Sequence, residues 1–411
     1  MPANAIEAAQ EALNEQTVID YVRNTPAYET VLGGAGHYLA TAITEGNINL
    51  LFRVKNETTG HSVLVKQALP YSWRYPEFKL PVQRAELEYE MLTLEGKYCP
   101  EQALKVYYYD TPNFISIIED LNKHLVMRDG LMQRQRYPLV AQHIGHFAAR
   151  TLFYTSDLYL PSAEKKAMIP RFMNPVMRKL QEDLCFTEPY SPNKNNRWTH
   201  LNDKQVYKIY DDDALRSEVF ILKERYMTHA QALIHNDLHT GSIMLNAHET
   251  KVIDPEFAFF GPIGHDVGSY LANLVLSYVA QEHHSPTDAE RKSYRQWILD
   301  SLRETWTVFE REFLACWEQD ALKGEWPSPQ YCRKYMRQLL QDSAGFGAAE
   351  IFRRTIGLAH VVDIDSIPDD QARAYVERLA LEIGERWLKQ RYQIESVDEL
   401  VEMVEMVVAA V

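Results

Sequence analysis

Two aspartates, each next to a short apolar run, are the residues of this 411-residue chain best suited to chemistry. Asp237 lies in the run His235–Ser242, which reads HNDLHTGS, and Asp254 follows Val252-Ile253. They are 17 residues apart, which leaves room for a loop and a β-hairpin that return both carboxylates to one cleft. Phosphoryl transfer from ATP requires one carboxylate that orients and deprotonates the accepting hydroxyl and another that holds Mg²⁺ on the phosphates. We therefore predict that Asp237 is catalytic and that Asp254 holds the metal.

Each aspartate also has a plainer explanation. Asp237 alone could be an Asx-turn residue, and Asp254 alone could end a strand. Their occurrence on either side of a predicted hairpin favours the catalytic interpretation. His235 and His239 have a spacing that binds zinc on one helix face, but Gly241 and the flanking strand-like runs argue against a helix. We expect His235 to be structural and to bond neighbouring backbone carbonyls.

The elements that must position these residues fall into two groups. Before residue 121 the pattern is strand-like, with hairpin signals at Glu45–Asn47 and Thr59-Gly60 and a single amphipathic helix. Apolar and β-branched runs predict strands at 37–44, 50–54, 62–69, 104–109 and 114–118, and the helix at 82–94. Gly33–Gly36 precedes the first strand, and we interpret it as a flexible turn.

After residue 121 the pattern is helical. Broad apolar faces predict helices at 138–153, 175–184, 217–233 and 289–316, with a packed helix at 397–411, a strand–turn–strand island at 234–253 and a surface loop at 188–203. Five strands and one helix followed by many helices are typical of an α+β, bilobal, protein-kinase-like fold. We predict a small β-rich N-terminal lobe at 1–121 and a larger, mainly helical C-terminal lobe at 122–411.

Composition narrows the class of protein further. The chain has 43 basic and 57 acidic residues, and this negative balance lacks the basic footprint of a nucleic-acid-binding protein. The most apolar segment, 271–280, is too short to cross about 30 Å of hydrocarbon, and residues 1–16 do not resemble a signal peptide. Its four cysteines form no C-x-x-C pair, which favours a reducing compartment. We expect a cytoplasmic protein that binds neither nucleic acid nor membrane.

The catalytic motif also resembles known families. His-x-Asp-Leu-His-x-Gly is similar to the catalytic loop of the aminoglycoside phosphotransferase and choline kinase group. The runs HTGS and IDPEFAFFGPIGHDVGSYLANL resemble the 5-methylthioribose kinase family continuously over 234–274. This resemblance implies ATP- and Mg²⁺-dependent phosphorylation of the anomeric hydroxyl of 5-methylthio-D-ribose, giving 5-methylthioribose 1-phosphate in methionine salvage. It also implies a homodimer, because family members are often dimers.

The resemblance assigns the metal and part of the ATP site around Asp254-Pro255-Glu256. Relatives usually carry an asparagine five residues after the catalytic aspartate as a second Mg²⁺ ligand, but this chain has Ser242, a poorer ligand. The family pattern implies that Glu256, together with Asp254, binds metal and ATP and compensates for the missing asparagine.

Further ATP contacts are implied in the first third of the chain. Lys66, in the apolar run LVKQA, would hold the α- and β-phosphates, and Glu88 best matches the register of its acidic partner. Gly46 and Asn47, in the run EGNIN, would cover the phosphates. The connector Glu119, Asp120 and Leu121 would bond adenine through backbone groups.

The segment EIFRRTIGLAH resembles the paired-arginine segment that binds the sugar in this family. Two guanidinium forks at Arg353 and Arg354 can bond ribose hydroxyls and offset charge on a transferring phosphoryl group. The alternative is a pair of arginines on a helix surface. One departure from the family is the run at 72–81, which lacks the usual Gly-Glu-Ser-Trp-Pro lid sequence. Trp73 or Phe78 would have to do the covering work of that lid.

Two other functions remain open at this point. A kinase for another hydroxyl, such as that of an aminoglycoside, choline or homoserine, would keep the catalytic loop but lack the Arg353-Arg354 segment. A non-catalytic nucleotide-binding pseudokinase would have lost Lys66, Asp237 or Asp254, and the chain retains all three.

Overall fold

The computed structural model describes residues 11–44, 48–321 and 328–410, and the chain divides into two compact units. The first comprises Met1–Lys123 with Pro255–Phe257, and the second comprises His124–Asp254 with Ala258–Val411. Asp254 and Glu256, two residues apart in sequence, therefore belong to different units.

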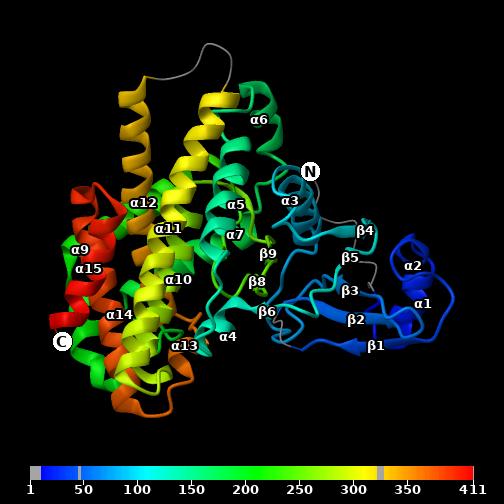
Figure 1. The fold of residues 1–411 in the computed structure, drawn as a ribbon, viewed down its shortest axis with the longest axis horizontal. Helices are drawn as coiled ribbons and strands as arrows, with labels where there is room; N and C mark the ends of the chain where they lie inside the picture. Colours follow the sequence, from blue (N-terminus) through cyan, green and yellow to red (C-terminus); the bar gives the residue numbers. More distant parts are fainter. Residues whose placement is uncertain (1–10, 45–47, 322–327, 411) are drawn as a thin grey trace. The chain divides into compact units, whose positions relative to one another are not determined.

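A five-stranded antiparallel sheet forms the centre of the first unit (Figure 1). Its spatial order is β1-β2-β3-β5-β4. The strands are β1 Tyr38–Ala42, β2 Leu50–Asn56, β3 Ser62–Gln67, β4 Val106–Asp110 and β5 Ile115–Glu119. All five predicted strands are confirmed, because alternating β-branched residues pack well on a pleated, half-buried surface.

The side-chain alternation of β3 gives its two faces different roles. Val63 and Val65 belong to a buried cluster with helices α1 Thr17–Arg23 and α2 Ala27–Thr30. Lys66, one position further, points to the opposite face, where α3 Arg84–Tyr98 packs on β4 and β5. The predicted helix at 82–94 is thus confirmed, although it starts two residues later and ends four residues later.

The second unit is mainly helical and carries two small antiparallel sheets (Figure 1). Its strands are β6 Leu125–Val126, β7 Ala232–Ile234, β8 Ile243–Leu245, β9 Thr250–Val252 and β10 Phe259–Gly261. Its helices are α4 Met127–Met132, α5 Val140–Tyr154, α6 Ser162–Met168, α7 Pro175–Phe186, α8 Asp203–Asp211, α9 Asp213–Thr228, α10 Ile263–His284, α11 Asp288–Asp320, α12 Pro329–Thr355, α13 Val362–Asp365, α14 Asp370–Gln390 and α15 Val397–Ala410. The α+β class, with a β-rich N-terminal part and a mainly helical C-terminal part, is confirmed.

One local prediction for this unit is wrong. The helix expected at 217–233 ends at Thr228, because Ala232–Ile234 leaves it to pair with β10. The polar stretch 188–203 lacks regular helix or strand over 191–199, as predicted for a loop, and contains short 3₁₀ turns at Glu188–Tyr190 and His200–Asn202. Strands β6 and β10 have two and three residues, too short for a period-2 pattern to reveal.

Helix α10 is the buried axis of the helical unit, with every residue from Ile263 to Gln281 buried. It contains the apolar stretch 271–280, so this stretch is a core helix. Two glycines on α10 allow a close approach to α12: a Cβ on Gly268 would lie 2.3 Å from the Ser343 carbonyl oxygen. A Cβ on Gly264 would lie 2.7 Å from the Asp342 Cβ. The two helix backbones therefore meet where no side chain fits.

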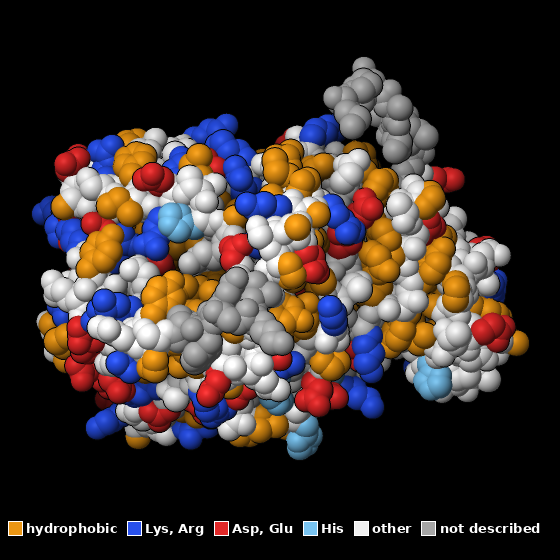
Figure 2. Space-filling model, turned by 90° about the horizontal axis from the view of Figure 1, so that it is seen from above, with side chains coloured by type: hydrophobic (Ala, Val, Ile, Leu, Met, Phe, Trp, Pro, Cys, Tyr) orange, Lys and Arg blue, Asp and Glu red, His pale blue; other side chains and the backbone are white. Residues whose placement is uncertain are grey.

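On the face drawn in Figure 2, lysines and arginines are interspersed with acidic and hydrophobic side chains rather than gathered into one basic field. No helix within 11–44, 48–321 or 328–410 combines the length and apolar character needed to cross a membrane.

Because α10 and α12 are in close contact, a single methyl group added at Gly268 should strongly affect stability. We expect Gly268→Ala to lower the free energy of unfolding by about 1–3 kcal/mol, because the new Cβ must displace a backbone carbonyl. Thermal denaturation followed by circular dichroism measures the change.

Gly96 on α3 is the matched control, since a Cβ added there would meet nothing within 4 Å. Gly96→Ala should raise helix stability by about 0.5–1 kcal/mol, because alanine loses less backbone entropy than glycine. Equal effects of the two substitutions would contradict the close contact of α10 with α12.

Candidate active site

The loop that carries Asp237 follows β7 and is fixed by the first turn of α10. The Asp266 carboxylate accepts hydrogen bonds from the backbone N–H groups of His235 and Asn236, at 2.7 and 2.8 Å. Asn236 has φ +67°, a left-handed conformation that asparagine tolerates better than most residues. Its side-chain oxygen accepts a 3.0 Å bond from the Tyr226 hydroxyl. A buried carboxylate thus sets the turn from which Asp237 projects.

His235 has the structural role expected from the sequence. Its Nε2 lies 2.9 Å from the Ile253 carbonyl oxygen, and its Nδ1 accepts the backbone N–H of Asp237 at 3.3 Å. The ring therefore links the catalytic loop to the residue before Asp254. His235 and His239 do not lie on a helix, so the helical arrangement behind the zinc alternative is absent from this described segment.

Ser242 fastens the loop from its far end. Its hydroxyl donates to the Asp237 carbonyl at 2.6 Å and accepts the backbone N–H of His239 at 3.0 Å. These bonds occupy the hydroxyl at the position where the family pattern places a metal-binding asparagine.

The Asp237 carboxylate is surrounded by hydrogen-bond donors but remains 20% exposed. Its Oδ1 lies 3.2 Å from Gln181 Nε2, 3.2 Å from Arg353 Nη1 and 3.5 Å from Arg354 Nη2. Its Oδ2 lies 3.3 Å from His239 Nε2. Burial alone would raise the pKa of Asp237, but His239 and the two arginines outweigh it and hold the pKa well below the usual value. Asp237 is therefore ionised at neutral pH.

Glu350 joins the two arginines to each other. Its Oε2 lies 3.1 Å from Arg353 Nη1, and its Oε1 lies 2.6 Å from Arg354 Nε. Asn273 on α10 donates to the same carboxylate at 3.1 Å. Burial opposes the charge on Glu350, but Arg354 and Arg353 lower its pKa to about 2.

Arg353 and Arg354 lie at the buried end of α12, with exposed fractions of 5% and 6%. The alternative of two arginines on a helix surface is therefore wrong. The sequence segment identified them correctly as a pair, and the structure brings both to the Asp237 carboxylate.

Arg128 on α4 completes the cluster. Its Nε lies 3.2 Å from Asp363 Oδ2 on α13, and its Nη2 lies 3.3 Å from Asn273 Oδ1 and 3.4 Å from His239 Nδ1. Sequence reasoning missed Arg128 and Gln181, because both reach the loop from more than 50 residues away in the chain and neither belongs to a motif.

Asp254 ends the β8–β9 hairpin segment with φ +62°, a strained backbone conformation for a residue other than glycine. Its side chain is exposed. In the first unit, Glu256 is buried and its Oε2 lies 3.4 Å from Arg84 Nε and 3.1 Å from Asn49 Nδ2. Both residues offer the carboxylate oxygens that Mg²⁺ prefers, so the donor chemistry fits this ion.

The first unit pairs Lys66 with Glu88: Nζ and Oε1 are 2.7 Å apart, and both side chains are buried. This is the acidic partner that the sequence favoured. Gly46 and Asn47 lie outside the described residues.

In the predicted adenine connector, Glu119 ends β5 and Leu121 is buried. The Asp120 carboxylate accepts Arg53 Nε at 2.8 Å and the Ser62 hydroxyl at 2.6 Å. The Asp120 side chain therefore bonds neighbouring strands of the sheet.

The segment at the position of the family lid run contains an exposed aromatic pair. Tyr75 and Phe78 pack edge to face with ring centroids 6.3 Å apart. Trp73 is half-buried, and its backbone N–H donates to the Ile48 carbonyl.

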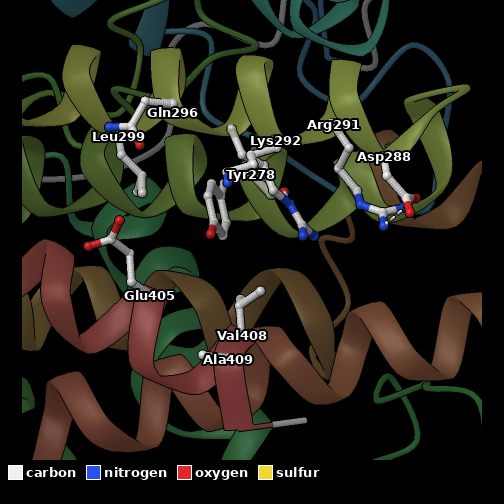
Figure 3. A pocket seen from close by; sticks show the side chains of 10 residues that line it. Tyr278, Asp288, Arg291, Lys292, Gln296, Leu299, Glu405, Val408 and Ala409 are labelled. Carbon is white, nitrogen blue, oxygen red and sulfur yellow. Dashed lines mark hydrogen bonds and ion pairs between the residues drawn. The ribbon is translucent and has the colours of Figure 1, made fainter.

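A separate hollow of about 440 Å³ lies between α11 and α15 (Figure 3). Its lining contains none of the described residues that contact Asp237. Arg291, one of its cationic residues, pairs with Glu282 at 3.2 Å and Asp288 at 2.8 Å. The cluster around Asp237 is therefore the candidate active site.

Glu350 yields a prediction about stability and pH. We expect Glu350→Gln to lower the free energy of unfolding at pH 7 by about 3–5 kcal/mol, because it leaves two buried guanidinium groups short of one negative charge. The folded-state pKa of Glu350, about 2, lies below its ordinary value of 4.5. The difference between the wild type and the variant is therefore full above pH 4.5 and shrinks as pH falls towards 2.

The measurement is urea denaturation at several pH values. Asp183→Asn is the control, because Asp183 forms an exposed i,i+4 pair with Lys179 on α7 and should change stability by about 0.5 kcal/mol or less. A Glu350→Gln effect as small as the control would refute the proposed charge balance.

Comparison with known proteins identifies the family of the chain. The family model described as "Phosphotransferase enzyme family" matches residues 177–304, which include the Asp237 loop. A methylthioribose kinase from Geobacillus thermodenitrificans is 38% identical over 362 residues, covering 88% of this chain and 89% of that protein. Methylthioribose kinase 1 of Oryza sativa subsp. japonica is 36% identical over 410 residues, covering 95% and 94%.

Among solved structures, a glucosamine kinase is similar at a TM-score of 0.50 and 14% sequence identity, covering 90% of this chain and 83% of that one. This likeness concerns the fold alone. The sequence identity over nearly the full length of both proteins decides the family. The chain belongs to the methylthioribose kinase family.

Proposed function

We propose that this protein transfers a phosphoryl group from ATP to the anomeric hydroxyl of 5-methylthio-D-ribose, giving 5-methylthioribose 1-phosphate in methionine salvage. The observation that carries the proposal is the partly exposed Asp237 carboxylate held against two buried arginines. The names of relatives that match most of the chain support the choice of sugar.

Asp237 orients the accepting hydroxyl and takes its proton. A carboxylate with a low pKa is a weak base, so the proton leaves late, as the bond to phosphorus forms. This suits phosphoryl transfer, in which positioning and electrostatic stabilisation supply most of the rate enhancement.

Arg353 and Arg354 bond hydroxyls of the sugar and offset negative charge on the transferring group. Glu350 holds both guanidinium groups in place before the substrate arrives, so little reorganisation accompanies the reaction.

On the nucleotide side, Lys66, fixed by Glu88, binds the α- and β-phosphates. The backbone of Glu119, Asp120 and Leu121 bonds adenine, and Gly46 and Asn47 cover the phosphates. Asp254 and Glu256, on either side of Pro255, would hold Mg²⁺, which neutralises charge on the phosphate oxygens.

The proposal extends to the assembly and its place in the cell. By resemblance to its family the protein is a cytoplasmic homodimer, and its ligands are the small sugar and ATP rather than nucleic acid or membrane. We propose functional lobes at residues 1–121 and 122–411, with boundaries close to those of the two compact units. Size-exclusion chromatography with light scattering tests the dimer.

The test of function is an ADP-release assay with Mg²⁺-ATP and four acceptors: methylthioribose, kanamycin, choline and homoserine. We expect turnover with methylthioribose alone, and a kcat reduced by about 10²–10⁴-fold in Asp237→Ala. The ATP affinity of this variant should stay close to wild type, because the proposed ATP contacts lie elsewhere in the sequence. The variant should remain folded but melt at a lower temperature than wild type, because the two buried arginines lose one carboxylate partner.

Turnover with another acceptor would support the proposed phosphotransferase reaction but refute methylthioribose as its substrate. An Asp237→Ala protein that neither folds nor binds ATP would refute the catalytic role. Binding of Mg²⁺-ATP without turnover of any acceptor would favour the non-catalytic alternative.

The arginine pair should set sugar affinity through its fork geometry. We expect Arg353→Lys and Arg354→Lys each to raise KM for methylthioribose about tenfold with little change in KM for ATP, since lysine keeps the charge but loses bidentate bonding. Arg337→Lys, at an exposed position of the same helix, should leave both constants unchanged. Steady-state kinetics at fixed, saturating ATP measures the effect on the sugar, with a matching series at saturating sugar for ATP. Equal shifts in both KM values would contradict a sugar-specific role.

A further inference from the structure

His239 lies against the catalytic carboxylate, yet its spacing from His235 pointed to no more than the zinc alternative. The side chain is 12% exposed and comes from the same loop as Asp237. Its Nε2 lies 3.3 Å from Asp237 Oδ2. Its other ring nitrogen faces away from the carboxylate and contacts two further groups.

Those two groups fix the protonation of the ring. Nδ1 accepts the backbone N–H of Gly241 at 2.8 Å and lies 3.4 Å from Nη2 of Arg128. A backbone amide and a guanidinium can donate hydrogen bonds but cannot accept them from a ring N–H. Nδ1 must therefore present its lone pair, and the proton of the neutral ring sits on Nε2, directed at Asp237.

Gly241 is required for this arrangement. A Cβ at this position would lie 2.7 Å from His239 Cε1 and 3.0 Å from Nδ1. The absence of a side chain lets the ring lie close against the Gly241 amide. The glycine of the motif thus has a physical purpose, namely the close approach of the histidine ring.

The donors on Asp237 are divided unequally between its oxygens. Oδ1 receives Gln181, Arg353 and Arg354, whereas the described contact to Oδ2 is His239. A carboxylate oxygen has two lone pairs, so Oδ1 is saturated while Oδ2 can accept one more hydrogen bond. Oδ2 is the oxygen with capacity for the hydroxyl of a substrate.

We infer that His239 is a positioning residue: held as the Nε2–H tautomer by Gly241 and Arg128, it orients Asp237 so that Oδ2 receives the substrate hydroxyl. As the hydroxyl oxygen bonds to the γ-phosphorus and the bond from that phosphorus to the ADP oxygen breaks, the hydroxyl proton passes to Oδ2. This inference rests on the proposed function. It adds that Oδ2 is the oxygen that takes the proton and that His239 orients it.

Two substitutions of His239 test the roles of its two ring nitrogens separately. In His239→Gln the amide nitrogen takes the place of Nε2 and keeps the donor to Asp237, but Nδ1 is lost. In His239→Asn the amide oxygen takes the place of Nδ1 and keeps the bond from Gly241, but the side chain no longer reaches Asp237.

If the inference is correct, the His239→Asn and His239→Gln variants rank in opposite orders for activity and for thermal stability. We expect His239→Asn to keep a melting temperature near wild type while kcat falls about 10²-fold, the scale of a misplaced catalytic group. His239→Gln should melt earlier but retain kcat within about fivefold, with KM for ATP unchanged in both variants. A purely structural role predicts that activity follows melting temperature, so a more active Asn than Gln variant would overturn the inference.

Gly241→Ala provides an independent test through the same ring. Its added Cβ should push His239 aside and lower kcat in the wild-type background, with little further loss in the His239→Asn background. Fully additive losses would overturn the inference, as would a Gly241→Ala enzyme with normal kcat.

The tautomer of His239 can be measured directly by NMR, without an activity assay. Long-range ¹H–¹⁵N spectra of histidine-labelled protein, with His239→Gln to assign the signal, should show Nε2 protonated and Nδ1 bare at neutral pH. A proton on Nδ1 would refute the inference even if the proposed kinase reaction is correct. Conversely, a wild type inactive on every acceptor would refute the proposed function while the spectrum still reports on the ring.

Discussion

The close approach of α10 and α12 is the constraint on which the site depends. Both helices carry groups that act at Asp237: α10 supplies Asp266 and Asn273, and α12 supplies Glu350 and the two arginines. Because Gly268 lets the backbones meet, these groups reach one loop from two directions. An added methyl group between the helices would separate the arginines from the loop that Asp266 holds.

The two units hold different clusters of charged residues. Every described group that contacts the Asp237 side chain comes from the helical unit, so this cluster is assembled within one compact body. The pair of Lys66 and Glu88 and the buried group of Glu256 with Arg84 belong to the β-rich unit. The run Asp254-Pro255-Glu256 contributes to both units, which explains why three consecutive residues serve such different surroundings.

Much of the fold could be predicted from the sequence because its signals are local. The five strands of the first unit alternate regularly, and the helices of the second carry broad apolar faces. Strands β6 and β10 escaped prediction, since two or three residues hold no periodic pattern. The end of α9 was misplaced because pairing with β10, a contact distant in sequence, overrides the local helical preference.

The same distinction applies to the site. Asp237, Arg353 and Arg354 sit in contiguous motifs, and the structure brings them together. Gln181 and Arg128 stand in ordinary helical surroundings and gain significance from contacts across more than 50 residues. The tautomer of His239 depends on such a contact as well, so no motif could have revealed it.

The way Glu350 shares its charge between two arginines has an evolutionary consequence. Replacing either arginine leaves a buried carboxylate half-neutralised, and replacing the carboxylate leaves two cations facing one acceptor. Substitutions among these three positions are therefore not independent, and their effects should not add. A lineage that changes this pair must pass through less stable intermediates or alter all three positions nearly together. The charge balance at the end of α12 thus limits how freely these three positions can diverge.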